Sequence, residues 1–257
     1  MSSIFSARGL TFAYPGRGHV LDKVNFDLAA GERVGLIGPN GAGKTTFFLL
    51  ACGIIKPLAG ELQIAGQPVV PGQFYPEVGM VFQHTADQLI CPSVREDIAF
   101  GPQNMGLPQE EVARRVEEAA RITGIEGLLE RPPHRLSGGE QRLVALAGVL
   151  AMEPRLLILD EPTSDLDLRY RRRLINLLAA MPEKAMLIAS HDLEFILEVC
   201  TRVVLLEGGR FQADGSPDAV MSDGSLMEKH GLEVPHSLTG TWHRHRGPAP
   251  GRRDLPG

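Results

Sequence analysis

The chain has 257 residues, of which 43% are hydrophobic, and it carries 31 acidic against 26 basic residues, a net charge of −5. This size allows one large domain or a domain with an appended subdomain, and the negative charge argues against a dedicated nucleic-acid binder. The three cysteines lie too far apart for a disulfide framework or a thiolate metal site. No apolar run approaches the about 18 residues of a membrane span and no signal peptide is recognisable, so any membrane role would act through a partner.

The first segments of the chain predict two short strands. Residues 4–12 and 20–28 carry alternating apolar side chains, and a turn rich in glycine separates them. Tyr14 ends the first strand, thirty residues before Lys44. An aromatic ring at this place could stack on a purine or pack on the sheet, and the spacing leaves both interpretations open.

Residues 38–46 then match the phosphate-binding pattern G-x-x-x-x-G-K-[ST], between the apolar runs 34–37 and 47–51. Glycines let the backbone curl so that several N–H groups point at a phosphate chain, and the following helix adds the positive end of its dipole. In this pattern the lysine reaches the β- and γ-phosphates and the next hydroxyl binds Mg²⁺. The predicted nucleoside-triphosphate site consists of Gly38, Pro39, Asn40, Gly41, Ala42, Gly43, Lys44, Thr45 and Thr46.

Strands are predicted at 61–65 and 78–82, and Gln83 follows directly. The chain then becomes helical over 93–130, where one helix opens at a capping box and a second runs from about 108 to 123. The charges on the second helix predict a solvated face without function, held by the i,i+4 pairs Glu110–Arg114, Glu111–Arg115 and Glu117–Arg121.

A third helix begins at the Ser137–Glu140 capping box and ends before residues 153–154. The apolar strand 156–159 follows and ends in Asp160 and Glu161, and the strand 185–189 leads to His191. Such apolar strands are typical of a buried parallel sheet, whose carboxyl edge binds ligands. The segments 203–206 and 210–212 predict a hairpin.

From residue 237 to 257 the composition favours a disordered cationic tail. Four histidines lie in or near it, and their spacing fits no compact metal-ligand set: His230, His236, His243 and His245.

The order of these features closely resembles the ATP-binding-cassette (ABC) ATPases over about residues 4–230. The segment 136–141, Leu-Ser-Gly-Gly-Glu-Gln, is the most specific element of this resemblance. The resemblance implies an α/β fold: a P-loop, RecA-like core with an antiparallel β subdomain and an α-helical subdomain at about 84–150, together spanning residues 1–236.

The resemblance also implies roles for single residues. Tyr14 would stack on adenine, Asp160, Thr45 and Gln83 would hold Mg²⁺, and His191 would contact the γ-phosphate. Glu161 would polarise the attacking water, which requires the chain to turn directly after Asp160 because neighbouring strand residues point opposite ways. Gln83 would also report the nucleotide state to the helical subdomain. The ATP of a second subunit would bind the signature residues Ser137, Gly138 and Gly139.

The second subunit would be an identical chain or a paralogue, arranged head-to-tail around two ATP molecules. Residues 164–167 match the dimer-contact loop of the family, although Asp165 stands where a small residue is more usual. This departure leaves the geometry of the loop open.

Residues 83–90 and 94–102 narrow the resemblance to the energy-coupling-factor branch of ABC importers, although His84 and Thr85 depart from the usual pattern. This branch implies a transmembrane coupling protein and a substrate-binding membrane component as partners, at the cytoplasmic face of the cell membrane. Cobalt or nickel is favoured as the substrate by residues 233–238, with a vitamin such as biotin as the alternative. Asp87 and Gln88 are expected to receive the coupling protein, or else to form an exposed turn.

Two other functions compete with this hypothesis. A soluble ABC ATPase of DNA repair or translation would carry a long coiled-coil or zinc-bearing insert, or two cassettes, and the sequence has one cassette and a short insert. A regulatory module without turnover would not need Glu161 and His191, and both are present.

Overall fold

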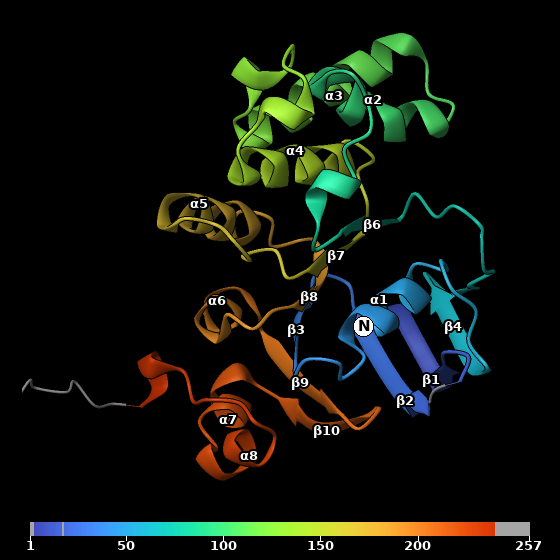
Figure 1. Ribbon diagram of the computed structural model, residues 1–257. Coiled ribbons are helices and arrows are strands. Elements are labelled where there is room, and N and C mark those ends of the chain that lie inside the picture. The colour runs from blue at the N-terminus through green and yellow to red at the C-terminus, as the bar shows by residue number, and fades with distance from the viewer. Residues whose placement is uncertain (1–2, 17, 240–257) are drawn as a thin grey trace, which may run out of the picture.

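The computed structural model describes residues 3–16 and 18–239, and its centre is a twisted six-stranded sheet (Figure 1). Five strands are parallel, and the hairpin strand β10 runs antiparallel to β9 at one edge. The order across the sheet is β10 (Arg210–Gly215), β9 (Arg202–Glu207), β3 (Arg33–Ile37), β8 (Ala185–Ala189), β7 (Leu156–Asp160) and β6 (Val78–Val81). The α/β class and the predicted hairpin are therefore confirmed.

A second, antiparallel sheet lies beside the first. Its strands follow the order β2 (His19–Ala29), β1 (Ser3–Ala13), β4 (Ala59–Ile64) and β5 (Gln67–Pro68). Helix α1 (Lys44–Ala51) packs between the two sheets, because Phe47 and Phe48 are fully buried in the core that the sheets share. The ring of Phe47 lies edge-on to Phe26, with 5.5 Å between centroids. Aromatic packing thus fixes the helix that carries Lys44.

Both faces of the central sheet are covered, as its apolar strands predict. In β7, Leu156 and Ile158 face the core around α1, whereas Leu157 and Leu159 face the opposite core. Their exposure is at most 1%, so the strand is buried on both sides. The opposite face carries four helices, α5 (Leu168–Ala179), α6 (Leu193–Val199), α7 (Pro217–Met221) and α8 (Gly224–Lys229). The sequence analysis had assigned no element to these four segments.

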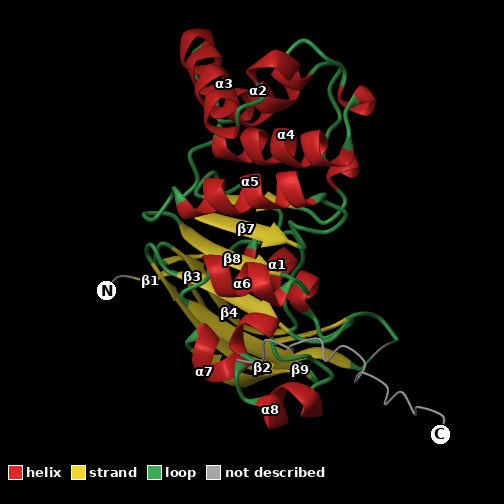
Figure 2. Ribbon diagram, turned by 90° about the vertical axis from the view of Figure 1, so that its left-hand side faces the viewer, coloured by secondary structure: helices red, strands yellow, loops and turns green. Residues whose placement is uncertain are grey.

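The helical subdomain lies above the edge of the sheet formed by β6 and β7 (Figures 1 and 2). It contains α2 (Val94–Asn104), α3 (Gln109–Thr123) and α4 (Gly138–Leu150), which share a hydrophobic core of their own. Short 3-10 turns connect the elements at η1 (Thr85–Asp87), η2 (Glu126–Leu128), η3 (Pro133–Arg135) and η4 (His236–Leu238). A separate core allows the subdomain to move as a unit relative to the sheet.

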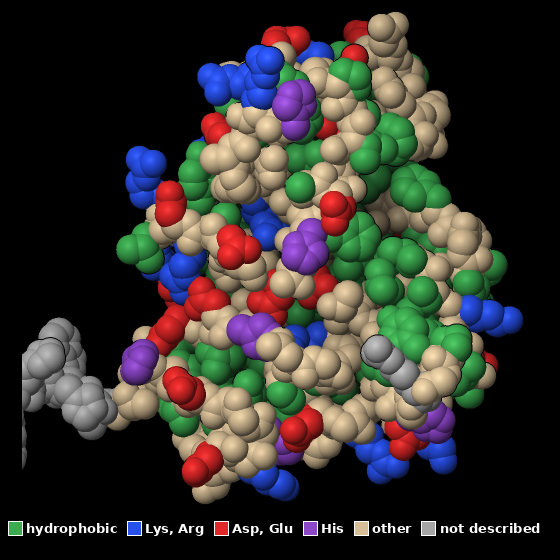
Figure 3. Space-filling view, viewed as in Figure 1, with side chains coloured by type: hydrophobic (Ala, Val, Ile, Leu, Met, Phe, Trp, Pro, Cys, Tyr) green, Lys and Arg blue, Asp and Glu red, His purple; other side chains and the backbone are tan. Residues whose placement is uncertain are grey.

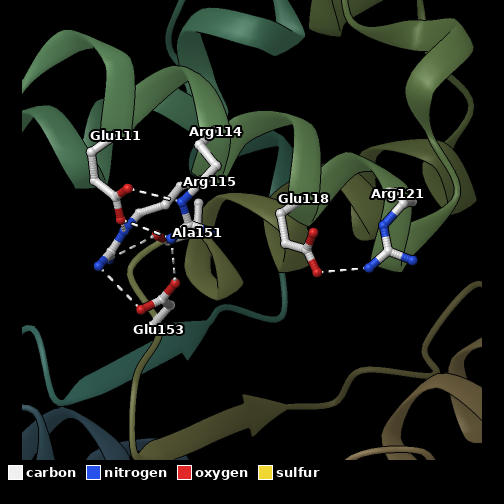
Figure 4. A network of polar contacts seen from close by, with 7 residues as sticks. All are labelled: Glu111, Arg114, Arg115, Glu118, Arg121, Ala151 and Glu153. Carbon is white, nitrogen blue, oxygen red and sulfur yellow. Dashed lines mark hydrogen bonds and ion pairs between the residues drawn. The ribbon is translucent and has the colours of Figure 1, made fainter.

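The charged face of α3 forms different pairs from those predicted, as Figure 4 shows. Only Glu111–Arg115 forms at i,i+4 spacing, with 2.8 Å between Oε1 and Nε. Glu153, which follows α4, lies 3.1 Å from Arg115 and draws the two adjacent arginines to one side. The other two predicted pairs are wrong, and the pairs formed instead are Arg114–Glu111, Arg121–Glu118 and Arg95–Glu117.

The described part of the predicted tail is short. Residues 237–239 belong to or follow η4, and the Ser237 hydroxyl donates a hydrogen bond of 2.5 Å to Glu194 on α6. Residues 240–257, with His243 and His245, lie outside the described residues. Within residues 3–16 and 18–239, no group of three potential metal ligands occurs and no helix is long and apolar enough to cross a membrane. His230 is buried and pairs with Glu207 instead.

Candidate nucleotide site

The phosphate-binding loop joins β3 to α1, and its glycines are required by the geometry. Gly38 has a φ of 148°, and a Cβ added there would lie 2.1 Å from the carbonyl oxygen of Leu206. Gly43 has a φ of 106°, a conformation that side chains rarely adopt. Substitution at either position would push the loop off β9 or distort the start of α1.

Helix α1 begins without a cap of its own. Gly43 stands at the N-cap position and offers no side chain to the first N–H groups, and the first turn carries no acidic residue. Free N–H groups at a helix N-terminus form an anion site with the helix dipole. This end of α1 can therefore bind a phosphate without displacing a side chain.

Lys44 is buried within this loop, with 7% of its surface exposed. Its Nζ donates hydrogen bonds to the carbonyl oxygens of Gly38 (2.7 Å) and Pro39 (3.1 Å). Burial lowers the pKa of Lys44, while the charges of Glu161 and Asp160 oppose that shift. The loop backbone thus holds the ammonium group where the predicted phosphate chain would pass.

Asp160 ends β7 next to this loop, and the Thr45 hydroxyl donates a hydrogen bond of 2.7 Å to its Oδ2. Burial raises the pKa of Asp160, while the Thr45 hydrogen bond and the Lys44 charge act in the opposite direction. A hydroxyl and a carboxylate in contact are hard oxygen donors of the kind that Mg²⁺ prefers. The donor set therefore fits a magnesium ion.

Glu161 turns out of β7 directly after Asp160, as its predicted role requires. Its φ of 47° is left-handed, and its N–H donates to the carbonyl oxygen of Ala189 on β8 (2.9 Å). The carboxylate is 9% exposed; Oε2 accepts a hydrogen bond from the backbone N–H of His191 (3.1 Å). Oε1 lies 3.3 Å from Nε2 of His191 and is buried without a hydrogen bond from the described residues.

These groups line one cavity of about 370 Å³, between the phosphate-binding loop and the carboxyl edge of the sheet. Tyr14 lies at its rim, where the phenol oxygen is 3.3 Å from Oγ1 of Thr46 and the ring packs edge-on against Phe12. The lining residues are Tyr14, Val20, Asn40, Gly41, Ala42, Gly43, Lys44, Thr45, Thr46, Gln83, Asp160, Glu161, Ser164 and His191. Most of the predicted site residues are thus brought together.

Two lining residues were missed by the sequence analysis as parts of this cavity. Val20 comes from β2, and nothing in its sequence context distinguishes it from other strand valines. Ser164 lies in the segment that resembles the dimer-contact loop, and this match could have placed it at the nucleotide. Asp165 beside it has a φ of 61°, which aspartate tolerates better than most residues.

The signature residues lie elsewhere in the chain. None of Ser137, Gly138 and Gly139 lines this cavity; they form the start of α4 on the helical subdomain. A Cβ on Gly139 would lie 2.5 Å from the ring of Tyr170, so the helix passes too close to α5 for a side chain. One chain therefore carries the two predicted halves of the site at separate places.

The predicted capping box at the start of α4 is complete. Ser137 Oγ accepts from the N–H of Glu140 (3.4 Å), and the Glu140 carboxylate accepts from the Ser137 N–H (2.8 Å) and hydroxyl (2.7 Å). Hydrogen bonds from the Ser137 backbone and hydroxyl lower the pKa of Glu140. At the start of α2, Ser93 accepts the corresponding hydrogen bond from Glu96.

A larger groove of about 530 Å³ opens where the helical subdomain meets the sheet. Its lining is mainly apolar, and Ile90, Phe100 and Phe74 expose 68%, 47% and 52% of their surface. Hydrophobic side chains gather on the right of the face in Figure 3, at the height of this junction. Gln88 turns inward and bonds the backbone of Met80 and Phe82 (3.1 and 3.2 Å), so it holds the segment in place.

The model of a known protein family, described as ABC transporter, matches residues 21–164, more than half of the chain. A Synechocystis sp. protein named as an ABC transporter ATP-binding protein is 54% identical over 90% of this chain and 81% of its own length. The energy-coupling factor transporter ATP-binding protein EcfA of Methanocaldococcus jannaschii is 41% identical over 90% of this chain and 86% of its own.

A solved structure shows the same architecture. The cbiO1 protein of Clostridium perfringens, described as part of the ABC transporter complex cbiONQ, has a TM-score of 0.78 and 34% identity. The alignment covers 93% of this chain and 98% of that protein. The sequence is therefore similar to these proteins over most of its length, and the fold is shared with cbiO1.

Proposed function

The chain belongs to the ABC transporter family as an ATP-binding protein of the energy-coupling-factor type, an ATPase coupled to transport, and we propose that it energises cobalt or nickel uptake. The observation that best supports an active enzyme is the cavity that Lys44, Asp160, Glu161 and His191 line together. A regulatory module without turnover would not need the buried carboxylate of Glu161. Cobalt or nickel is favoured over a vitamin by residues 233–238.

ATP binding is assigned to the phosphate-binding loop and to Tyr14. The free N–H groups at the start of α1 and the Lys44 ammonium attract the phosphates, while the glycines admit them close to the backbone. Tyr14 at the rim of the cavity stacks on the adenine. Thr45, Asp160 and Gln83 hold Mg²⁺, which neutralises the phosphate charge when it is bound.

Hydrolysis is assigned to Glu161 and His191. Glu161 lines the cavity and its Oε1 accepts no hydrogen bond from the described residues, so we assign to it the proton of an attacking water. His191 lies 3.3 Å from that oxygen and is half exposed, which lets its Nε2 turn towards the γ-phosphate. The hydrogen bond from the His191 backbone N–H to Oε2 keeps the Glu161 carboxylate oriented while the His191 ring turns.

A second ATPase subunit completes the site in this proposal. Ser137 and Gly138 are exposed at the start of α4, with the buried Gly139 behind them, and none of the three lines the cavity of its own chain, which supports a role at the nucleotide of a partner. The partner is a second copy of this chain or a paralogue in head-to-tail arrangement. ATP closes this dimer, and hydrolysis reopens it.

Transmembrane partners take up this motion at the cytoplasmic face of the membrane. The apolar groove beside Ile90 and Phe100 supports docking of a partner helix, because exposed apolar side chains rimmed by polar ones form the core of protein interfaces. Asp87 is exposed but does not line this groove, whereas Gln88 lines it and bonds the backbone of its own chain. The net negative charge speaks against nucleic acid as a partner.

Co-purification of the chain from detergent-solubilised membranes tests this function. We expect an integral membrane coupling protein and a substrate-binding component to be retained, and reconstituted vesicles to take up cobalt or nickel when ATP is supplied. Ile90→Ser should weaken retention about tenfold while basal hydrolysis stays unchanged, because a central apolar contact contributes about 1–2 kcal/mol. Leu58→Ser is the matched control, since Leu58 is 64% exposed on another surface.

Retention of soluble proteins alone would contradict the importer function, and ATP-driven vitamin uptake would replace the metal as substrate. Equal retention of the Ile90 and Leu58 variants would remove the groove from the proposal. If only soluble proteins are retained, a soluble ABC ATPase is the better description.

A further inference from the structure

Arg142 is a buried charge that the mechanism above does not use. It lies on α4, one turn after Gly138, and only 5% of its surface is exposed. Burying a guanidinium costs several kcal/mol unless the group is paired and hydrogen-bonded. Such a residue therefore needs a structural or functional reason.

Its hydrogen bonds reach across the boundary between the helical subdomain and the core. Nη1 donates to the carbonyl oxygen of Phe82 (2.9 Å) and Nη2 to that of Gln83 (3.0 Å). These two residues directly follow β6, where the chain leaves the sheet for the helical subdomain. The Phe82 N–H is bonded to Gln88 as well, so this short segment is fixed from both sides.

The guanidinium is also influenced by the negative charges at the edge of the nucleotide cavity. Asp165, Asp160 and Glu161 all attract its charge, while burial is the larger influence and lowers the pKa of Arg142. Its Nε is buried and has no hydrogen-bond partner among the described residues. One planar group thus connects α4 with the backbone of Phe82 and Gln83.

We propose that Arg142 is a positioning residue that sets Gln83 against the nucleotide and ties its place to the orientation of α4. The same helix carries Ser137 and Gly138 at its start, so a rotation of α4 moves the partner-facing end and the Gln83 backbone together. The inference rests on the proposed role of Gln83 at the nucleotide. Arg142 would then link the movement of the two separate halves of the site, the nucleotide cavity and the start of α4.

A double-mutant cycle tests this inference in the full-length protein. We expect Arg142→Met to lower kcat for ATP hydrolysis between about 10- and 100-fold, since a small misplacement of a reacting group has effects of this size. The KM for ATP should stay within about twofold, because the phosphate-binding loop is untouched. Arg142→Lys should recover part of the rate, because it keeps the charge and one hydrogen bond.

The decisive comparison uses a Gln83→Ala background. Without the Gln83 side chain nothing is left to position, so adding Arg142→Met should lower kcat no further. The matched control is Arg115→Met, since Arg115 is also shielded, with 13% of its side chain exposed, but pairs with Glu111 and Glu153 away from Gln83. It should hydrolyse ATP at the wild-type rate. Thermal unfolding of every variant accompanies the kinetics.

Independent effects in the double variant, multiplying those of the single ones, would overturn the inference while leaving the proposed function intact. So would equal losses in the lysine and methionine variants with matching drops in Tm, since they would indicate stability alone. A Gln83→Ala protein with wild-type turnover would instead contradict the proposed role of Gln83 itself, and the inference with it.

Discussion

The two helices that carry the proposed phosphate contacts begin in opposite ways. Helix α1 starts at Gly43, without a side-chain cap and without an acid in its first turn. Helix α4 starts at Ser137, inside a complete capping box whose carboxylate belongs to Glu140. The start of α1 can therefore receive an anion, whereas the start of α4 is already occupied by the Glu140 carboxylate.

For the proposed function, the difference predicts that the two ends serve different stages of the cycle. A phosphate can bind α1 at once, because no side chain among the described residues caps its first N–H groups. At α4, a phosphate must compete with Glu140 for the Ser137 hydroxyl, because this hydroxyl donates a hydrogen bond of 2.7 Å to the Glu140 carboxylate. We infer that ATP first binds α1 of one subunit and that α4 of the other joins only when the dimer closes.

The largest expected effect comes from changing Glu161, the glutamate in the cavity at the start of α1. Glu161→Gln should lower steady-state hydrolysis by about 10² to 10⁴, since a positioned general base contributes this much. ATP binding should persist, because Lys44 and the free end of α1 remain. Turnover and dimer mass, measured together, check this: trapped ATP should hold the dimer closed. A Glu161→Gln variant that turns over like the wild type would remove Glu161 from its role.

A smaller, intermediate effect tests whether the two ends belong to different chains of one site. Lys44→Ala impairs the α1 half and Ser137→Arg the α4 half, so each protein alone should be inactive. In an equimolar mixture, one site of each mixed dimer is intact, which should restore up to about a quarter of wild-type activity when half of the dimers are mixed. Native mass spectrometry measures the mixed dimers, and their inactivity would contradict completion by a partner.

The smallest expected effect concerns the charge at α4. Glu140→Gln keeps an acceptor for the Ser137 N–H but removes the carboxylate, so a partner's ATP should bind about two- to fivefold more tightly, as for one charge at a helix end. Dimer formation against ATP concentration measures this. Unchanged affinity would show that Glu140 does not compete with the phosphate.

Glu140 also makes the stability of the wild-type chain depend on pH, and the same variant should reduce this dependence. The pKa of Glu140 is lowered below its ordinary 4.5 in the folded chain, so its contribution is present above that value and is lost as the pH falls through the lower, folded pKa. Glu140→Gln should therefore flatten this acid part of the unfolding profile. Urea titrations at neutral pH and at about pH 3, below the ordinary value, measure the change.

The sequence predicted the phosphate-binding loop and the edge of the sheet because both depend on local rules. The glycine spacing fixes the loop, and parallel strands bring Asp160 and His191 to one edge regardless of what lies between them. The resemblance added the helical subdomain. Helix α5 was not predicted although its signals exist: Asp167 caps it and Leu174, Ile175 and Leu178 recur on its buried face.

Other contacts could not be read from the sequence, because they join side chains to a distant backbone. Gln88 seemed an exposed docking residue, yet it bonds Met80 and Phe82 within its own chain. Arg142 binds two carbonyl oxygens about sixty residues before it, and carbonyls are the same in every residue. Two of the three predicted ion pairs on α3 were wrong for a related reason, because Glu153 and Arg95 approach the helix only in the folded chain.

The left-handed backbone of Glu161 has a consequence for the evolution of the protein. A residue other than glycine in this conformation is strained by about 1–3 kcal/mol, and Asp165 repeats the conformation four positions later. Glycine at position 161 would relieve the strain but would remove the carboxylate. Selection for thermal robustness and selection for turnover therefore oppose each other at this residue. A stabilised descendant of the chain would have to gain its stability elsewhere.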